Sequence, residues 1–329
     1  MAAPDAQPTW LITGATGFVG SALLRLFNDT NPAVSLRLMQ RQAVVPDTQG
    51  NTRVQADLQS PESLLRACQG VETVIHLAGV AHVGRAAGAL ARSSNLGGTL
   101  SLLDAAVAAG ARRFVYLSSS LAAATEGDAT PYGQDKRAAE EALLAAGQAR
   151  RIEVIILRAV NIYGVGMRGN IAAMIRLIQR GWLPRLPRFT NTISLIGVDD
   201  VARALVAAAC LPSEGESLAL RVTLTDGEAY VIHEIDEAIA QHVKRTTNGR
   251  HPSPLRLPAV LLFAAAAIAE VLEKLRIFRS GISLRTYRSL TRDNVFDNTA
   301  ACEALAFAPS TTFYAQLPAI IDAMQPRKP

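Results

Sequence analysis

Short apolar runs alternate with stretches of helical periodicity along the first half of the chain. The runs are rich in Val, Ile and Leu and have the length of buried strands; they lie at residues 9–13, 34–39, 52–57, 73–78, 113–120 and 153–158. Helical stretches separate them, and one of these starts at Pro61 with Ser60 as its expected N-cap. This alternation predicts an α/β fold, a doubly wound parallel sheet with helices on both faces.

The regular alternation loosens after the sixth run. Proline-bearing stretches follow, and helices are expected near residues 232–244 and 258–275. The apolar pattern from residue 192 onward predicts one more strand and a helix that return to the main sheet. We therefore expect a large domain over residues 1–165, completed by residues 192–224, and a smaller C-terminal lobe over residues 166–191 and 225–329.

Composition sets limits on the class of protein. The chain has 329 residues, of which 49% are hydrophobic and 19% charged, as in a globular protein with a sizeable core. Its net charge of +5 favours anionic small molecules as ligands. Only 5% of residues are aromatic and no basic block is interleaved with aromatic residues, so we expect no nucleic-acid partner.

The cysteines and the apolar runs bear on the compartment. Cys68, Cys210 and Cys302 lie far apart without a CxxC pattern, which indicates buried thiols in a reducing compartment and neither a disulfide framework nor a metal site. The first eight residues do not have the pattern of a signal peptide, so we expect a cytoplasmic protein. The longest apolar run, Ala259–Ala269, is shorter than the ~20 residues of a membrane span. We interpret it as a core helix, with contact to a bilayer surface as the alternative.

A glycine-rich turn follows the first strand. Its sequence, TGATGFVG, places Gly14, Gly17 and Gly20 between a strand and a helix. Glycines there permit a tight turn and let backbone N–H groups approach a pyrophosphate at the helix N-terminus. We therefore expect residues 1–165 to form a dinucleotide-binding Rossmann domain. The expected cofactor contacts in this turn are Gly14, Thr16, Gly17, Phe18, Val19 and Gly20.

The end of the second strand distinguishes the two nicotinamide dinucleotides. NAD-binding proteins place a carboxylate there, whereas this chain has Arg41 and no acidic residue before Asp47. An arginine suits a 2′-phosphate, so NADP(H) is favoured and NAD(H) remains the alternative. Further cofactor contacts are expected after the third and fourth strands, at Asp57, Leu58, Leu77, Ala78 and Gly79. His76 is interpreted as a core histidine whose hydrogen bonds are satisfied, with a catalytic role as the alternative.

Several motifs in one order resemble a known family. The glycine turn, HLAG at residues 76–79, a strand that ends in serines and the Tyr-x-x-x-Lys of YGQDK at 132–136 follow one another. Together they resemble the extended short-chain dehydrogenase/reductases, the branch of NAD-dependent sugar-nucleotide epimerases, dehydratases and reductases. The likeness continues through residues 157–164, 194–205 and 297–309. Residues 166–181 are most similar to those of reductases and epimerases that act at C4 of UDP-linked N-acetylated hexoses.

Chemistry and the resemblance together indicate the catalytic residues. Tyr132 and Lys136 are four residues apart at the start of an expected helix, so they share one face. A phenol with a pKa near ~10 is a poor base, but a neighbouring ammonium and a nicotinamide cation favour the phenolate. We expect Tyr132 to act as acid/base during hydride transfer and Lys136 also to bind the nicotinamide ribose. The resemblance adds Ser119 as the residue that orients the substrate oxygen, with Ser120 as the alternative.

The resemblance implies that the smaller lobe binds the substrate. Asn161 matches an asparagine that contacts the sugar nucleotide, and Asn170 is expected at the diphosphate or as a helix N-cap. His82 follows the HLAG turn and is expected to face the substrate. The resemblance also implies that the long helices at 87–109 and 131–147 form a homodimer interface.

One departure from the family weakens the sugar-nucleotide assignment. Many of its members carry a basic residue just before the strand read here as ISLIGV, whereas this chain has TNT at residues 190–192. The nearest arginine is Arg188, and Arg288 or Arg292 could supply the charge. A hydrophobic alcohol or ketone, as for hydroxysteroid dehydrogenases and dihydroflavonol reductases, is therefore the alternative substrate class. A non-enzymatic NADP sensor is a third hypothesis, against which the intact Tyr132–Lys136 pair counts.

Overall fold

The computed structural model describes residues 7–30, 33–42, 51–79, 96–125, 130–149, 152–181, 184–212, 219–246, 253, 255–274 and 284–324. The chain divides into two compact units, each built from several pieces of sequence. Unit 1 comprises Met1–Val160, Val198–Leu224 and Asn298–Pro309. Unit 2 comprises Asn161–Gly197, Thr225–Asp297 and Ser310–Pro329.

A seven-stranded parallel sheet forms the centre of unit 1. Its strands are β1 (Thr9–Thr13), β2 (Ser35–Gln40), β3 (Thr52–Gln55), β4 (Thr73–His76), β5 (Arg113–Ser119), β6 (Glu153–Ala159) and β9 (Ala219–Leu224). They lie in the order β3-β2-β1-β4-β5-β6-β9, and every neighbouring pair is parallel. The chain reverses its direction of progress across the sheet between β1 and β4, as in a doubly wound fold. The predicted fold class is confirmed.

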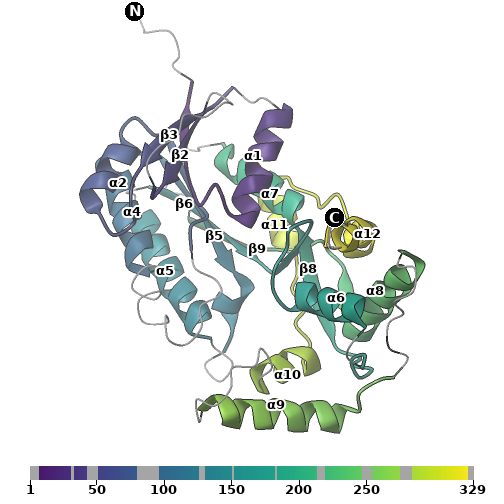
Figure 1. The fold of residues 1–329 in the computed structure, drawn as a ribbon. Coiled ribbons are helices and arrows are strands. Elements are labelled where there is room, and N and C mark those ends of the chain that lie inside the picture. The colour runs from purple at the N-terminus through teal and green to yellow at the C-terminus, as the bar shows by residue number, and fades with distance from the viewer. Residues whose placement is uncertain are drawn as a thin grey trace, which may run out of the picture. The chain divides into compact units, whose positions relative to one another are not determined.

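Helices cover both faces of this sheet (Figure 1). One face carries α2 (Pro61–Cys68), α4 (Gly98–Ala108) and α5 (Pro131–Gln148), and the other carries α1 (Phe18–Thr30), α7 (Val198–Ala209) and α11 (Thr299–Leu305). A short 3-10 helix, η3 (Ser120–Ala123), follows β5 directly. The Ser60 hydroxyl accepts from the Ser63 amide, and Pro61 occupies the first turn of α2, so the predicted N-cap is confirmed.

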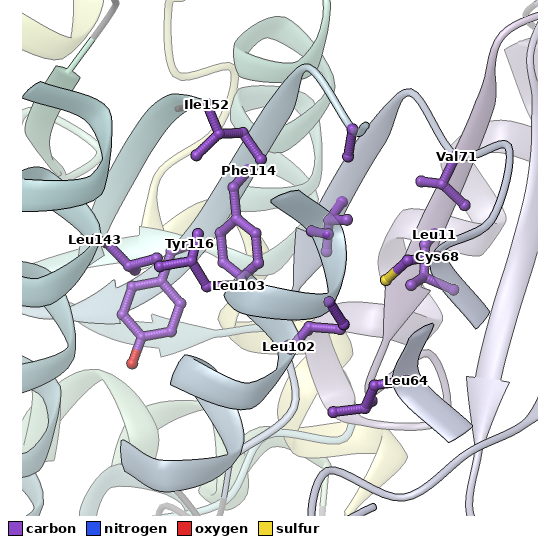
Figure 2. Close-up of a cluster of buried hydrophobic side chains, with 14 of the residues drawn as sticks. Leu11, Leu64, Cys68, Val71, Leu102, Leu103, Phe114, Tyr116, Leu143 and Ile152 are labelled. Carbon is purple, nitrogen blue, oxygen red and sulfur yellow. The ribbon is translucent and has the colours of Figure 1, made fainter. Parts of the chain in front are cut away.

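Apolar side chains from β1, β4, β5 and β6 pack against α2, α4 and α5. Figure 2 shows this cluster, in which Phe114 and Tyr116 of β5 lie on the face of the sheet that is covered by α4 with Leu102 and by α5 with Leu143. All four of these side chains are at most 2% exposed. Fully burying one large aliphatic or aromatic side chain contributes about 1.5–3 kcal/mol, so this cluster fixes the helices on the sheet.

Unit 2 contains a smaller sheet of three strands. They are β7 (Asn161–Tyr163), β8 (Thr192–Gly197) and β10 (Ala229–Val231), in the order β10-β8-β7. Its helices are α6 (Asn170–Arg180), α8 (Ile232–Thr246), α9 (Ala259–Lys274), α10 (Leu284–Thr291) and α12 (Phe313–Ala323).

The prediction that residues 192–197 join the main sheet was wrong. The β8 strand pairs in parallel with β7 and antiparallel with β10, whereas β6 already has β5 on one edge and β9 on the other. With both edges of β6 occupied, β8 has no place beside it. The later part of the returning segment does belong to unit 1, as α7 and β9.

A buried carboxylate ties the three chain segments of unit 2 together. Asp226 Oδ2 accepts from the Tyr163 hydroxyl at 3.0 Å and from the Tyr230 hydroxyl at 2.7 Å. The Tyr163 hydroxyl also lies 3.0 Å from the Thr311 carbonyl oxygen, and the Phe313 amide donates to the Tyr230 oxygen at 2.9 Å. Each of these buried polar atoms therefore has a hydrogen-bond partner within the protein.

A second carboxylate anchors the segment that leads into α9. Asp236 is 1% exposed and lies between two guanidinium groups, with Arg185 Nη2 at 2.7 Å and Arg256 Nη1 at 3.1 Å from its Oδ2. Arg256 also donates to the Leu186 carbonyl oxygen and pairs with Glu237 at 2.7 Å. Removing either arginine would leave the buried Asp236 charge less well compensated, which is destabilising. The two ion pairs therefore stabilise the position of the chain that leads into α9.

Two further predictions were wrong. The helix at 258–275 was interpreted as a core helix, yet Val260 and Ile268 of α9 are 76% and 60% exposed. Cys68 is buried as expected, but Cys210 is exposed, because it follows the last turn of α7, and Cys302 is only partly buried. Among the described residues, no helix has the length and apolarity needed to cross a membrane.

Candidate active site

The turn between β1 and α1 can hold a phosphate only because it is built from glycine. Gly14 has φ +74°, and a Cβ on it would lie 2.8 Å from the Ala78 amide nitrogen. A Cβ on Gly20 would lie 2.3 Å from the Gly14 carbonyl oxygen. The first turn of α1 has no acidic side chain of its own, so the positive end of the helix is open to an anionic group. This turn fits a dinucleotide pyrophosphate.

The HLAG segment is fastened to the end of β1. The Leu77 amide donates to the Thr13 carbonyl oxygen at 3.2 Å, and the Ala78 amide donates to the Thr13 hydroxyl at 3.2 Å. The small residues Ala78 and Gly79 thus follow β4 beside the glycine turn.

His76 is a core histidine, as predicted. Its Nδ1 lies 2.7 Å from the Thr13 hydroxyl and its Nε2 lies 3.0 Å from the Thr99 hydroxyl. Burial, with the nearby Lys136 charge second, lowers the pKa of His76 to about 3. The ring is therefore neutral at physiological pH and has no hydrogen-bonding capacity left for a substrate.

The residues after β2 and β3 lie on the surface of unit 1. Arg41 follows β2 directly, is exposed, and accepts at its carbonyl oxygen from Gln55 Nε2 at 3.3 Å. Asp57 is exposed as well, and its Oδ1 accepts from the Gln59 amide at 2.9 Å. One Asp57 oxygen therefore closes the turn after β3. Leu58 packs against Gly98, where a Cβ would lie 2.9 Å from the Leu58 Cβ.

The N-terminus of α5 positions Tyr132 and Lys136. Thr130 caps the helix, because its hydroxyl accepts from the Gly133 amide at 2.8 Å, and Pro131 occupies the first turn. A Cβ on Gly133 would lie 2.4 Å from the Leu121 carbonyl oxygen, so glycine allows α5 to pack closely on η3. These contacts hold Tyr132 in the first turn of α5 and Lys136 one turn further along, on the same face.

Lys136 is buried against strand β5. Its ammonium donates to the Leu117 carbonyl oxygen at 2.8 Å, and it lies 4.3 Å from the Tyr116 ring centroid and 5.9 Å from the Tyr132 ring centroid. Burial lowers the pKa of Lys136 to about 8, against the opposing effect of Glu140. The lysine therefore titrates close to the physiological range.

Burial opposes the charge effects expected at Tyr132. It raises the pKa of Tyr132 to about 12, whereas Lys136 and a nicotinamide cation together were expected to move that pKa toward neutrality. The ammonium engages Leu117 and the Tyr116 ring, so desolvation of the phenolate dominates. Tyr132 consequently carries its proton at neutral pH and is prepared to donate it.

The three serines that end β5 differ in what their hydroxyls do. The Ser118 hydroxyl is buried and donates to Glu140 Oε1. The Ser119 oxygen caps η3 by accepting from the Leu121 amide at 3.3 Å, and this residue is only partly buried. Ser120 is 8% exposed. The cap therefore uses the Ser119 oxygen and not its hydroxyl proton.

Sequence reasoning missed Glu140, which lies one helical turn beyond Lys136. Its side chain is 0% exposed and receives both the Ser118 hydroxyl and the Arg158 guanidinium, whose Nη2 lies 2.5 Å from Glu140 Oε2. Arg221 Nη1 lies 3.6 Å from the same oxygen. The i, i+4 spacing of an acidic residue after Lys136 was the signal in the sequence. The structure thus adds a buried carboxylate to the face that holds the tyrosine and the lysine.

Two of the expected substrate residues, Asn161 and Asn170, lie in unit 2. Asn161 begins β7 and Asn170 begins α6, and both are exposed. Asn170 does not cap α6, because Gly169 occupies the N-cap position with φ +96°. His82 lies outside the described residues. Within the described ranges, no cluster of three or more His, Cys, Asp or Glu side chains could hold a metal ion.

Unit 1 thus brings most of the predicted site together. The glycine turn, Ala78, Ser119, Tyr132 and Lys136 all lie at or just beyond the carboxyl ends of β1, β4 and β5. Ligands of open α/β sheets bind at this edge, where the strand order reverses.

Comparison with known proteins agrees with this geometry. The NAD dependent epimerase/dehydratase family matches residues 10–232. A ceramide reductase of Caulobacter vibrioides is 32% identical over 295 residues, which cover 88% of this chain and 86% of that protein. A UDP-glucose 4-epimerase of Vibrio cholerae is 27% identical over 255 residues, which cover 72% of this chain and 76% of that protein. The solved structure of MoeE5 in complex with UDP-glucuronic acid and NAD is 25% identical, with a TM-score of 0.70, and the match covers 96% of this chain and 98% of that one.

Proposed function

The chain belongs to the NAD dependent epimerase/dehydratase family, and from this membership we propose that it reduces a ketone on a hydrophobic substrate with NADPH. The observation that carries hydride-transfer chemistry is the position of Ser119, Tyr132 and Lys136, which lie at or just beyond the carboxyl end of β5, where burial also raises the pKa of Tyr132 to about 12. A reductase needs a proton donor, whereas oxidation of an alcohol starts from a proton acceptor.

The residues of unit 1 would hold the cofactor along the carboxyl edge of the sheet. The glycine turn and the N-terminus of α1 bind the pyrophosphate, and Arg41 pairs with the 2′-phosphate. Asp57 accepts from the adenine amino group, Leu58 and residues 77–79 line the path, and Lys136 binds the nicotinamide ribose. When bound, the reduced cofactor supplies a hydride to the substrate carbonyl carbon.

Ser119 and Tyr132 act on the substrate oxygen. The Ser119 hydroxyl donates a hydrogen bond that orients the carbonyl, and Tyr132 donates its phenolic proton to the same oxygen. One hydride and one proton thereby convert the ketone into a secondary alcohol. The Lys136 ammonium, on the same face of α5, stabilises the phenolate left on Tyr132 until solvent returns the proton.

Two observations support a hydrophobic substrate. The relative with the highest identity given above is named a ceramide reductase, and its likeness extends over 88% of this chain. Thr190 and Asn191, which lead into β8, and Thr192, its first residue, include no cation to hold a diphosphate. We infer a ketone attached to a long apolar chain, as in a lipid.

A nucleotide-activated sugar is the second candidate, and sequence reasoning placed it first. The MoeE5 complexes and the Vibrio cholerae epimerase support it, since both names include a UDP-sugar. In this candidate Asn161 and Asn170 contact the sugar nucleotide, and the chemistry is reduction or epimerisation at C4. We infer an NADP sensor to be the weakest candidate, because the chain keeps the full Ser119, Tyr132 and Lys136 set.

Consumption of NADPH with a panel of substrates tests the proposal. Long-chain 3-keto amides in detergent should be reduced, UDP-sugars should not, and Tyr132→Phe should remove turnover. Interconversion of UDP-glucose and UDP-galactose without net oxidation of NADPH, together with no ketone turnover, would overturn the proposal in favour of the sugar. A melting-temperature titration with UDP on top of saturating NADP⁺ gives an independent readout, since a ligand that binds only the folded state raises the midpoint. The hydrophobic substrate predicts no rise with UDP.

A further inference from the structure

Helix α9 presents an apolar face to solvent. Val260, Leu261, Ile268 and Val271 are 76%, 55%, 60% and 55% exposed, and their spacing places them on one side of the helix. Every residue from Ala259 to Ala269 is apolar, so no polar side chain interrupts this face over that length. Scattered exposed apolar residues are ordinary, but a contiguous apolar surface usually marks an interaction site.

The opposite side of α9 is packed within unit 2. Ala266 is 0% exposed, and the Phe263 ring, although 49% exposed, lies 5.3 Å from the Tyr287 ring of α10. Tyr287 in turn meets the Phe189 ring at 6.0 Å, and the Leu284 amide donates to Glu270 at 3.3 Å. Figure 1 shows α10 along one side of α9. The exposed face is therefore held in a fixed orientation by the packed one.

Positive charge is concentrated in the same part of the sequence. Residues 259–292 contain six Lys or Arg and two Glu, a net charge of +4, whereas the whole chain carries +5. The rest of the chain is therefore close to neutral. Of these cations, Arg288 of α10 and Arg292 just after it are exposed in the structure. Anionic lipid headgroups attract such a segment by about 1 kcal/mol for each cation near the surface.

The length of α9 decides how it could meet a bilayer. Its 16 residues extend about 24 Å, and a span needs ~20 apolar residues. A helix with one apolar face and cations beside it lies in the plane of the interface, with the apolar face at the boundary of headgroups and acyl chains. We propose that α9 is a membrane-surface anchor that docks unit 2 on an anionic bilayer through Val260, Leu261, Ile268 and Val271.

This anchor goes beyond the proposed reaction and does not depend on it. It depends on the exposed side chains and the charge of one segment, and on no property of the site in unit 1. If the substrate is a lipid ketone, the anchor keeps the enzyme at the surface where that ketone resides.

Flotation of the purified full chain with vesicles tests the anchor in the absence of substrate. Vesicles of phosphatidylcholine with roughly a third phosphatidylglycerol should carry the protein, and vesicles of phosphatidylcholine alone should carry less of it. The double variant Leu261→Glu, Ile268→Glu should partition at least about tenfold less, because two buried apolar contacts are replaced by charges. The matched control is Leu65→Glu, which changes a leucine that is 39% exposed on α2 of unit 1 and should float like the parent.

A second variant keeps the test independent of folding at α9. Arg288→Glu leaves the apolar face intact and should weaken binding to the anionic vesicles, with no change on phosphatidylcholine alone. Melting temperatures equal to that of the parent exclude misfolding for each variant.

Three outcomes would overturn the anchor. The parent could fail to float, the double variant could float like the parent, or the parent could be a dimer that the double variant dissociates without any binding to vesicles. The last outcome would assign the face to a second copy of the chain. If the parent protein binds the vesicles but reduces no ketone, the proposed function is overturned and the anchor is not.

Discussion

The Lys136 ammonium lies 4.3 Å from the centroid of the Tyr116 ring, over a strand residue that no motif singles out. A cation over an aromatic face is stabilised by about 0.5–2 kcal/mol, which partly offsets the desolvation that lowers the pKa of Lys136. Tyr116 is thus a positioning residue for the lysine.

Two substitutions of Tyr116 should distinguish the effect of its ring from the effect of its hydroxyl. Tyr116→Phe keeps the aromatic face, so kcat should stay within about threefold of the parent, whereas Tyr116→Leu should lower it by about tenfold. In the leucine variant the pKa of Lys136 falls further, so the alkaline limb of the kcat profile should move to lower pH. Equal profiles for the two variants would show that the ring has no electrostatic role.

Replacing Tyr132 with Phe should remove the proton donor. Turnover should fall by about a thousandfold or more, since a positioned general acid contributes 10²–10⁴. The Kd for NADPH, followed by cofactor fluorescence, should change little because Tyr132 contributes one contact among many. A variant that keeps most of its turnover would exclude Tyr132 as the acid.

Replacing Arg41 with Ala should weaken NADPH far more than NADH. A charge-assisted, bidentate contact to the 2′-phosphate exists only with the phosphorylated cofactor. The ratio of the two Kd values measures this directly, and Arg66→Ala, which removes another exposed arginine, should leave it unchanged. Equal losses for the two cofactors would contradict the 2′-phosphate role.

The rate of reduction should depend on pH through Lys136. Below its pKa of about 8 the lysine is charged and stabilises the Tyr132 phenolate, so kcat should be level there and fall as the pH rises above it. Tyr132 keeps its proton until about pH 12. His76, with a pKa of about 3, should add no step near its usual pKa. A kcat profile that stays level to pH 10 would rule out the lysine as the titrating group.

Removing the partner of the buried Glu140 should destabilise unit 1. Arg158→Met leaves a carboxylate that is 0% exposed with Ser118 and a distant Arg221, at a cost of about 3–5 kcal/mol in the free energy of unfolding. The double variant Arg158→Met, Glu140→Leu should recover much of that loss, because it removes the orphaned charge. Urea unfolding measures both. Similar losses in the free energy of unfolding for the single and the double variant would show that the destabilisation comes from lost packing and not from the unpaired charge.

Local chemistry made the large sheet predictable. The apolar runs at β1 and β5 and the cap at Ser60 depend on neighbouring residues, and the structure has them where the pattern predicts. The partner of β8 could not be predicted in this way. Thr192–Gly197 has the pattern of a buried strand in either sheet, and its pairing with β7 and β10 depends on residues far from it in the sequence.

The candidate site was likewise predictable from local sequence only in part. Glycines, Tyr132 and Lys136 are recognisable because their chemistry requires those residue types at that spacing. The hydrogen bond of Lys136 to Leu117, by contrast, brings together residues from a helix and a strand. Burial then decides the pKa of Tyr132, and burial depends on the whole of unit 1.

The hydrogen bonds around Asp226 have a consequence for how the protein is made. Tyr163, Asp226 and Thr311 each lie close behind a point where the chain enters unit 2, and one phenol joins all three. A ribosome delivers these residues in order, with Thr311 last. The nascent chain can form the sheet from β1 to β6 early, but unit 2 closes only after nearly the whole polypeptide has emerged. Premature termination before Thr311 therefore leaves Tyr163 and Asp226 without the segment that completes their contacts.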